Sequence, residues 1–318
     1  MGITKNHQSE GTLRRMAEAA FPGRGVVSIR ELTEGLCNAA YLLELTDGTR
    51  TVLKIAAADG QGLLRNEEGM MRAEVDALER VRGLGDVPVP AVYAHDFSRT
   101  RCSGAYFFME ALPGASMFSQ RDSLPEATRV ALHRALGRMA RRVGSLTGER
   151  FGLLGGQARY DTLLDFFRAL MDNVLLDAEE KAVDLCYPYD DFRAALERDA
   201  DCFQEVTVPR LVHWDLWEGN IFVQDGVITG LIDWERAMWG EPFMDDRFRR
   251  HNRTAAVLEG YGQTAFSREE MRRILWYDVF LYLTMMTEGS FRQYPDGSQY
   301  RWVRPLMLSS REELERTR

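Results

Sequence analysis

Four polar residues in the second half of the chain have the types and the spacing that a phosphoryl-transfer site needs. His213, Asp215 and Asn220 form the pattern H-x-D-x-x-x-x-N, and Asp233 follows after a predicted β-hairpin. In such a site the aspartate of the loop accepts or orients the substrate hydroxyl, while the asparagine and the second aspartate offer hard oxygen ligands to Mg²⁺. A single aspartate is more often a cap or turn residue, so the prediction depends on the combination.

A second candidate pair, Lys54 and Glu74, lies in the first half. The chain has only three lysines among its 40 basic residues. Lys54 stands between two apolar residues of a predicted strand, where its ammonium group must reach the surface or meet an acid. Glu74 lies on the apolar face of the next predicted helix and is a candidate for that acid. The alternative is an exposed lysine and an exposed glutamate that do not touch.

The elements that must position these residues fall into two groups, separated at Pro113-Gly114, which is a candidate hinge. In the first group we expect a helix over residues 9–21, a hairpin of strands 41–45 and 51–55 closed at Asp47-Gly48, a helix capped by Asn66 and ending near Gly83, and a strand over 105–109. In the second group we expect helices over 125–143, 161–177 and 192–203, and short strands at 211–212, 221–223 and 227–232. The predicted fold is α+β and bilobal, with residues 1–112 as a small antiparallel-sheet lobe and residues 113–318 as a mostly helical lobe.

Length and composition exclude several classes of protein. The 318 residues are 45% apolar and 28% charged, which is typical of a globular chain rather than a disordered one. The net charge of −8 argues against a general nucleic-acid binder. Four scattered cysteines form no C-x-x-C pair, and no apolar run is long enough to span a membrane. We therefore expect a cytoplasmic protein that binds neither nucleic acid nor membrane.

The glycine-containing loop at residues 34–38, the strand lysine, the helix glutamate, the hinge, the H-x-D-x-x-x-x-N loop and the later aspartate occur in the order that a bilobal kinase needs. With these motifs the chain resembles the aminoglycoside phosphotransferase and choline kinase family, small-molecule relatives of protein kinases, from about Val26 to the C-terminal helices. The resemblance implies a protein-kinase-like fold with a nucleotide-binding first lobe and a catalytic second lobe. In the second lobe, the resemblance implies that Asp215 is the catalytic aspartate, that His213 supports its loop, that Asn220 and Asp233 bind Mg²⁺, and that Asp245 braces the lobe. In the first lobe, it implies that Lys54, held by Glu74, contacts the α- and β-phosphates and that the loop with Gly35 and Asn38 covers the triphosphate. The backbone of Glu110 and Leu112 would contact the purine.

The chain departs from the family pattern at several positions. Trp214 stands beside the predicted catalytic aspartate, where the family usually has a small residue, and Trp217 follows two residues after that aspartate. These residues predict a narrower or more aromatic acceptor mouth. With a tryptophan at position 217, the loop resembles that of the ketosamine kinase branch. Glu241 stands before Pro242 in place of the usual aspartate, a change of reach but not of charge. Cys37 lies in the predicted phosphate loop, either as a thiol whose oxidation would block nucleotide binding or as a small buried hydrophobe.

The predicted activity is Mg²⁺-dependent transfer of the γ-phosphate of ATP or GTP to a hydroxyl of a small acceptor. An aminoglycoside-like antibiotic is the first choice, and a ketosamine, an amino sugar or a choline-type alcohol is the alternative. Most of the acidic excess lies in residues 113–318, which suits a cationic acceptor, and Asp245, Asp246 and Glu288 are candidates for binding its amine or are simply solvated.

Other classes of function are less well supported by the sequence. A nucleotide-binding pseudokinase sensor is the alternative from another class, and the presence of all the expected polar groups disfavours it. A protein kinase is disfavoured because no D-F-G or A-P-E segment follows, and a P-loop enzyme is excluded because no Gly-Lys dipeptide occurs. The oligomeric state stays open.

Overall fold

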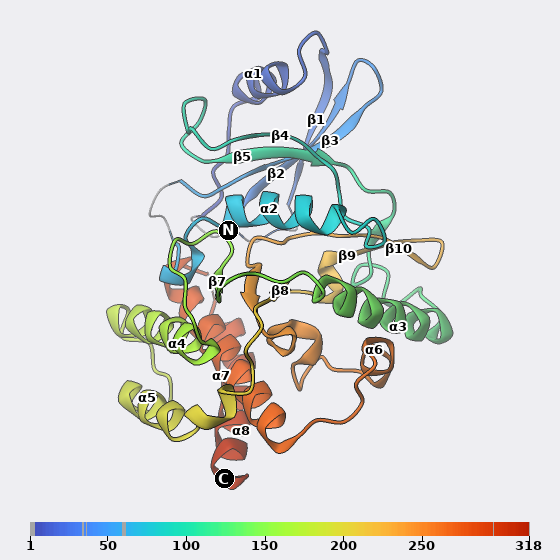
Figure 1. The fold of residues 1–318 in the computed structure, drawn as a ribbon. Coiled ribbons are helices and arrows are strands. Elements are labelled where there is room, and N and C mark those ends of the chain that lie inside the picture. The colour runs from blue at the N-terminus through green and yellow to red at the C-terminus, as the bar shows by residue number, and fades with distance from the viewer. Residues whose placement is uncertain (1–3, 34, 36, 59–61, 295, 318) are drawn as a thin grey trace.

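The computed structural model has two lobes, which lie one above the other in Figure 1. It describes residues 4–33, 35, 37–58, 62–294 and 296–317. The upper lobe is built on a five-stranded antiparallel sheet with the strand order β1-β2-β3-β5-β4, and the lower lobe is mostly helical. The predicted α+β, bilobal fold is confirmed, while the domain boundary at residue 112 stays a prediction.

The elements of the upper lobe are α1 (Glu10–Ala20), β1 (Val26–Leu32), β2 (Ala39–Leu45), β3 (Arg50–Ile55), η1 (Arg65–Glu67), α2 (Met70–Arg82), β4 (Val92–Asp96) and β5 (Tyr106–Glu110). The elements that follow are β6 (Ala115–Ser116), α3 (Glu126–Val143), β7 (Gly152–Leu153), α4 (Leu163–Glu180), α5 (Tyr189–Arg198), η2 (Ala200–Phe203), β8 (Arg210–Val212), η3 (Glu218–Asn220), β9 (Ile221–Gln224), β10 (Val227–Leu231), β11 (Met238–Gly240), η4 (Pro242–Met244), η5 (Asp246–Phe248), α6 (Ala255–Tyr261), α7 (Arg268–Phe291) and α8 (Ser298–Arg316). The predicted hairpin over residues 41–55 is confirmed as β2 and β3, and the short strands β6, β7 and β11 were not expected from the sequence.

The two faces of the sheet meet different neighbours. Phe107 and Phe108 are adjacent in β5 and both fully buried, so their side chains leave opposite faces of the sheet. Phe108 packs in the cluster with α1, and Phe107 packs in the cluster shared with α2 and the lower lobe. Lys54 is paired directly with Phe107 in the β3–β5 register and therefore shares its face. This register directs Lys54 toward α2 and the gap between the lobes.

The start of α2 differs from the sequence-based expectation. Asn66 does not cap this helix: it lies in η1, where its side-chain amide donates to the carbonyl of Leu170 at 2.9 Å. The helix begins at Met70 after Gly69, whose φ of +71° is open to glycine but strained for other residues. A Cβ at Gly69 would lie 2.2 Å from the carbonyl oxygen of Gly155. The segment before α2 is thus pressed against the lower lobe, and this contact sets where the helix begins.

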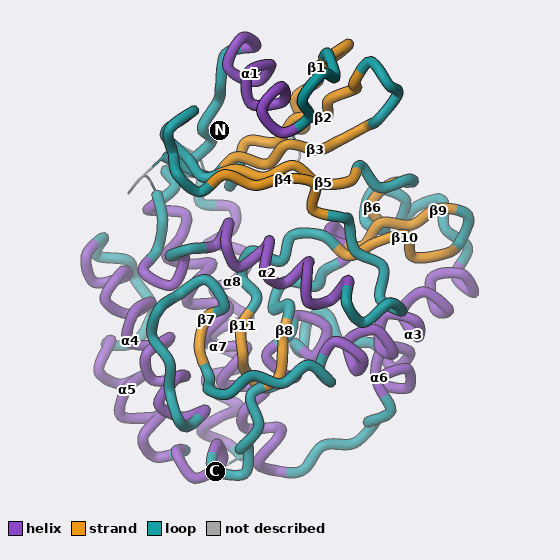
Figure 2. Tube along the Cα trace, turned by 45° about the horizontal axis from the view of Figure 1, so that its top comes forward, coloured by secondary structure: helices purple, strands orange, loops and turns teal. Residues whose placement is uncertain are grey.

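Small sheets and long helices form the lower lobe. The strands β10, β9 and β6 form one three-stranded sheet, and β7, β11 and β8 form another, which lies below α2 in Figure 2. The helix α7 is buried over most of its length and packs against α4 and α8. Among the helices that the structure describes, none is long and apolar enough to cross a membrane.

Candidate active site

The loop after β8 carries the H-x-D-x-x-x-x-N pattern, and His213 supports it from inside. The buried His213 ring donates from Nε2 to the carbonyl of Ile232 at 2.9 Å and accepts the backbone N–H of Asp215 at Nδ1, at 3.3 Å. Burial lowers the pKa of His213 to about 4, so the ring is neutral at physiological pH and can make both bonds. These contacts agree with the structural role expected for His213.

Trp214 adopts an uncommon backbone conformation that its neighbours hold in place. Its φ is +76°, in the left-handed region that non-glycine residues rarely occupy. Its N–H donates to Oδ2 of Asp245 at 3.2 Å, and its carbonyl accepts the N–H of Asp246 at 3.1 Å. Asp245 therefore braces the loop that carries Asp215, a more specific position than the bracing of the lobe that the sequence suggests. Strained backbone of this kind is commonly found at functional sites.

Asp215 and Asn220 lie side by side at the end of this loop. The side-chain amide of Asn220 donates to the backbone carbonyl of Asp215 at 2.8 Å and lies 3.4 Å from its Oδ2. Only part of Asp215 is exposed to solvent. Its burial, together with the nearby negative charge of Asp233, raises the pKa of its carboxyl group well above the usual range. A carboxylate with a raised pKa is a better proton acceptor than an ordinary one.

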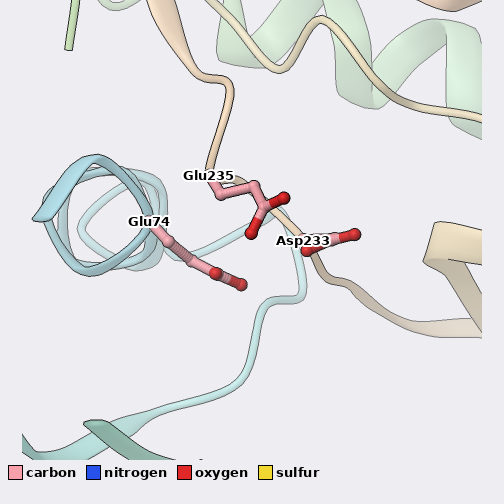
Figure 3. A group of neighbouring side chains, drawn as sticks. All are labelled: Glu74, Asp233 and Glu235. Atoms are coloured by element: carbon pink, nitrogen blue, oxygen red, sulfur yellow. The ribbon is translucent and has the colours of Figure 1, made fainter. Parts of the chain in front are cut away.

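Lys54 joins the two lobes at the centre of a carboxylate cluster. Its Nζ lies 2.5 Å from Oε2 of Glu74 and 3.3 Å from Oε2 of Glu235, and it contacts Oδ1 of Asp233 more closely still. Figure 3 shows the three carboxylates converging from α2 and from the segment after β10. Burial works to lower the pKa of Lys54, but the carboxylates outweigh it and the net direction is strongly upward. The predicted Lys54–Glu74 contact is present, and the exposed alternative is wrong.

The carboxylate cluster fits a divalent cation. Ligand oxygens of Glu74, Asp233 and Glu235 lie within 4.8 Å of one another, and a single ammonium group faces three carboxylates in a largely buried setting. Oε1 of Glu74 is buried without a hydrogen-bond partner. Hard oxygen donors with surplus negative charge suit Mg²⁺. The side-chain oxygen of Asn220, at the neighbouring loop end, accepts no hydrogen bond from the described residues.

Glu235 was not assigned a role from the sequence. It lies two residues after Asp233, whose φ of +68° bends the chain after β10, and the turn that follows brings ligand oxygens of both acids within 4.8 Å of each other. Its Oε2 also accepts the side-chain amide of Asn38 at 2.5 Å, which connects the predicted phosphate loop to the acid cluster. Two acids separated by one residue after a strand were therefore the signal that could have identified it.

The rest of the predicted phosphate loop is only partly described. Glu34 and Leu36 lie outside the described residues. Gly35 faces open space, since a Cβ there would meet only the carbonyl oxygen of Asn38, at 4.0 Å. Cys37 is buried, and burial raises the pKa of its thiol to about 12, so a thiolate is strongly disfavoured and the buried-hydrophobe reading fits.

The predicted purine contacts lie where the chain leaves β5. The backbone N–H of Glu110 donates to the carbonyl of Ala91 at 2.8 Å, so this N–H is engaged within the protein. The backbone N–H of Leu112 has no backbone partner among the described residues. The Leu112 side chain packs against Gly230, where a Cβ would come within 2.3 Å of it. Of these two N–H groups, that of Leu112 is the one without a backbone acceptor among the described residues.

The two tryptophans of the catalytic loop have different environments. Trp214 is buried, with its ring centroid 6.1 Å from that of Phe280, so the expectation that it narrows the acceptor mouth is not met. Trp217 is 39% exposed, and its ring lies 5.2 Å from that of Phe118, which is also exposed. Of the two tryptophans, Trp217 is the one exposed enough to offer an aromatic surface near the loop that carries Asp215.

The other acids considered from the sequence are buried and paired. Glu288 contacts the guanidinium groups of Arg236 and Arg292, and Asp246 contacts Arg247 at 3.2 Å. Neither side chain is therefore free for an amine of the acceptor, and neither is simply solvated. Glu241 forms a buried ion pair with Arg273 at 2.8 Å, so the negative charge at the position before Pro242 has a structural partner.

This combination of a sheet lobe with a lysine–glutamate pair and a helical lobe with an H-x-D-x-x-x-x-N loop defines a protein-kinase-like phosphotransferase. The family model described as "Phosphotransferase enzyme family" matches residues 28–274. The chain belongs to this family, and the predictions of a family resemblance and of an enzyme are confirmed. No match was found among curated proteins.

Similar solved structures agree with this fold. A protein provisionally assigned as a fructosamine-3-kinase from Thermobifida fusca YX-ER1 has 18% identity and a TM-score of 0.68, over 96% of this chain and 100% of that chain. A thermostable mutant of aminoglycoside phosphotransferase APH(4)-Ia, in a ternary complex with AMP-PNP and hygromycin B, has 18% identity and a TM-score of 0.64, over 96% of this chain and 98% of that chain. The streptomycin–ATP complex of APH(2")-IIa has 16% identity and a TM-score of 0.61, over 95% and 97%.

Proposed function

We propose that this protein transfers the γ-phosphoryl group of ATP to a hydroxyl of a small, cationic, hydroxylated molecule. The observation that carries the proposal is the convergence of Lys54, Glu74 and Asp233 between the lobes, next to the loop that holds Asp215 and Asn220. A site that positions a triphosphate, a divalent cation and a hydroxyl together needs these groups. ATP is preferred to GTP because two of the similar structures are described as complexes with ATP or AMP-PNP.

The upper lobe holds the nucleotide in this proposal. Lys54, kept charged by its carboxylates, contacts the α- and β-phosphates, and Glu74 fixes its position. The N–H of Leu112 donates to the purine, and the loop with Gly35 and Asn38 covers the triphosphate. Oriented donors of this kind neutralise charge that develops on the phosphoryl oxygens.

Mg²⁺ would be held by Asp233, Asn220 and Glu235, and when bound it neutralises phosphate charge and keeps the phosphoryl group in line with its acceptor. The chain prepares this site by keeping the acids close together and by balancing part of their charge with Lys54. Asn220 connects the metal site to the loop, because its amide group holds the backbone of Asp215.

Asp215 orients the acceptor hydroxyl and takes its proton as the oxygen attacks the γ-phosphorus. The bond from the γ-phosphorus to the bridging oxygen of ADP breaks, and ADP leaves with the electron pair. The raised pKa of Asp215 suits this role because the carboxylate can hold the proton once it has been transferred. His213 and Asp245 keep the loop in the required conformation.

The acceptor is proposed to be an aminoglycoside-like molecule first and a ketosamine second. A net charge of −8 favours a cationic acceptor over an anionic one. The exposed ring of Trp217, two residues after Asp215 in the chain, suits either acceptor, since an aromatic face stacks on the apolar face of a sugar or on a cation.

The test is ADP and GDP release by the purified protein with Mg²⁺ and either nucleotide, across a panel of aminoglycosides, ketosamines, amino sugars and choline. Asp215→Asn is the blank, and Asp225→Asn, in the exposed turn between β9 and β10, is the matched control. We expect ADP release that depends on one acceptor class, persists in Asp225→Asn and is lost in Asp215→Asn. Nucleotide binding without release for any acceptor would contradict the proposal and favour a pseudokinase sensor.

A further inference from the structure

A buried ion cluster lies next to the catalytic loop but outside the phosphate site. Its members are Glu67, Arg236, Glu288 and Arg292, here called the Arg236 cluster. Arg236 lies 2.6 Å from Glu67 and 3.4 Å from Glu288. Arg292 contacts the same two carboxylates at 2.5 and 3.0 Å. All four side chains are at most 17% exposed, and two cations balance two anions, so the cluster is a fully paired charge network.

The cluster ties together elements that are distant in the sequence. Glu67 lies in η1, just before the helix that carries Glu74, and Glu288 and Arg292 lie at the end of α7. Arg236 lies three residues after Asp233. The η1 segment is further fixed to α4, where Arg65 and Asn66 contact Asp177 and Leu170. The lead-in to α2 is therefore attached to the lower lobe, and Arg236 is the cluster member nearest the phosphate site in sequence.

Arg236 makes one contact with the loop of Asp215 that Arg292 lacks, whereas Arg292 donates to the hydroxyl of Tyr294 at 3.1 Å. The guanidinium carbon of Arg236 lies over the indole ring of Trp214, 5.0 Å from the ring centroid, at a distance typical of a cation–π interaction. Among the described residues, Arg292 has no such contact with an aromatic ring. Trp214 directly precedes Asp215 and holds a left-handed φ, so its ring position and the loop conformation depend on each other. The two arginines share their carboxylates but not this ring.

We propose that Arg236 is a positioning residue that fixes Trp214, and through it Asp215, relative to the η1 segment in front of α2. The carboxylates of Glu67 and Glu288 aim the guanidinium group, and its face holds the indole in place. The proposal rests on the proposed catalytic role of Asp215, but its structural part stands on the contacts alone. Arg292 serves the cluster as a charge partner without touching the loop.

Hydrogen exchange at the catalytic loop tests the structural part without any acceptor. Arg236→Gln and Arg292→Gln remove the same charge from the same carboxylates and are a matched pair. We expect the Trp214 and Asp215 amides to exchange about tenfold faster in Arg236→Gln, and to change less than about twofold in Arg292→Gln. Equal effects of the two variants at these amides would overturn the proposal.

A second variant keeps the test valid if Arg236→Gln does not fold. Arg236→Lys retains the positive charge but loses the planar guanidinium, and we expect it to fold with faster exchange at the same amides. Unchanged exchange in a folded Arg236→Lys would equally overturn the proposal.

The catalytic part is tested by steady-state kinetics with the acceptor found above. We expect kcat to fall about tenfold in Arg236→Gln with the KM for ATP nearly unchanged, and to change little in Arg292→Gln. In a Trp214→Leu background, the loss of Arg236 should cost much less, because the ring that it positions is gone. If the wild type turns over no acceptor, the proposed function fails, and the exchange result still decides whether Arg236 positions the loop.

Discussion

The Nζ atom of Lys54 lies 2.5 Å from Oε2 of Glu74, a contact that connects β3 of the upper sheet to α2. The pair is almost completely buried, and Lys54 also forms an ion pair with Asp233 in the lower lobe. A single ammonium group therefore connects the sheet, the helix and the acid expected to bind the metal.

Replacing Lys54 by Met should destabilise the protein by about 3–5 kcal/mol, because it leaves buried carboxylates without their cation. Thermal or urea unfolding measures this loss. Lys54→Met combined with Glu74→Leu should recover much of it, since the second change removes one of the orphaned charges. A double variant no more stable than the single one would contradict the pairing.

Glu235→Gln should raise the Mg²⁺ concentration needed for half-maximal activity by about 10- to 100-fold, because the cation loses a charged oxygen donor. The measurement is a Mg²⁺ titration of ADP release, with Asp225→Asn as the exposed control. An unchanged Mg²⁺ requirement would assign Glu235 only to holding Asn38 and Lys54.

Trp217→Ala should raise the KM for the acceptor by about 2- to 13-fold, the range that corresponds to the roughly 0.5–1.5 kcal/mol of an aromatic contact. The KM for ATP should stay within about twofold, because Trp217 lies on the catalytic loop away from the Lys54 cluster. Trp302→Ala, at another exposed tryptophan on α8, is the control. Equal changes for acceptor and nucleotide would remove Trp217 from the acceptor mouth.

Stability should depend on pH through His213. Its pKa of about 4 in the folded protein lies below the ordinary value of 6.5. The unfolded chain therefore binds the proton more readily, and stability that is complete above pH 6.5 is lost as the pH falls toward 4, by about 3 kcal/mol. Urea unfolding at a series of pH values should show a shallower pH dependence for His213→Gln than for the wild type. Parallel pH profiles for the two proteins would mean that another group is responsible.

The predicted elements differ in how well they matched the structure. The β2–β3 hairpin was predictable because its turn at Asp47-Gly48 and its apolar alternation are local signals. The start of α2 was not, because Asn66 is drawn into a bond with Leu170 and Gly69 is pressed against Gly155. Contacts between distant segments can override a local capping preference.

The candidate site divides in the same way. Asp215, Asn220 and Asp233 could be found because their spacing along one loop and one hairpin is itself the signal. Glu235 and Arg236 lie just beyond that motif, and their roles come from partners on other elements, Asn38 for the former and Glu67 for the latter. No spacing rule reports such partners.

The sequence by itself determined the class of chemistry, because catalytic loops are short motifs whose residue types and intervals are written along the chain. It also determined which lysine matters, since Lys54 stands in a strand beside an acid on the next helix. Only the tertiary structure decided that Trp214 is buried while Trp217 is exposed, and that Arg236 lies over the Trp214 ring. Burial and pairing depend on which segments distant in the sequence pack together, and that is decided by the packing of the whole chain.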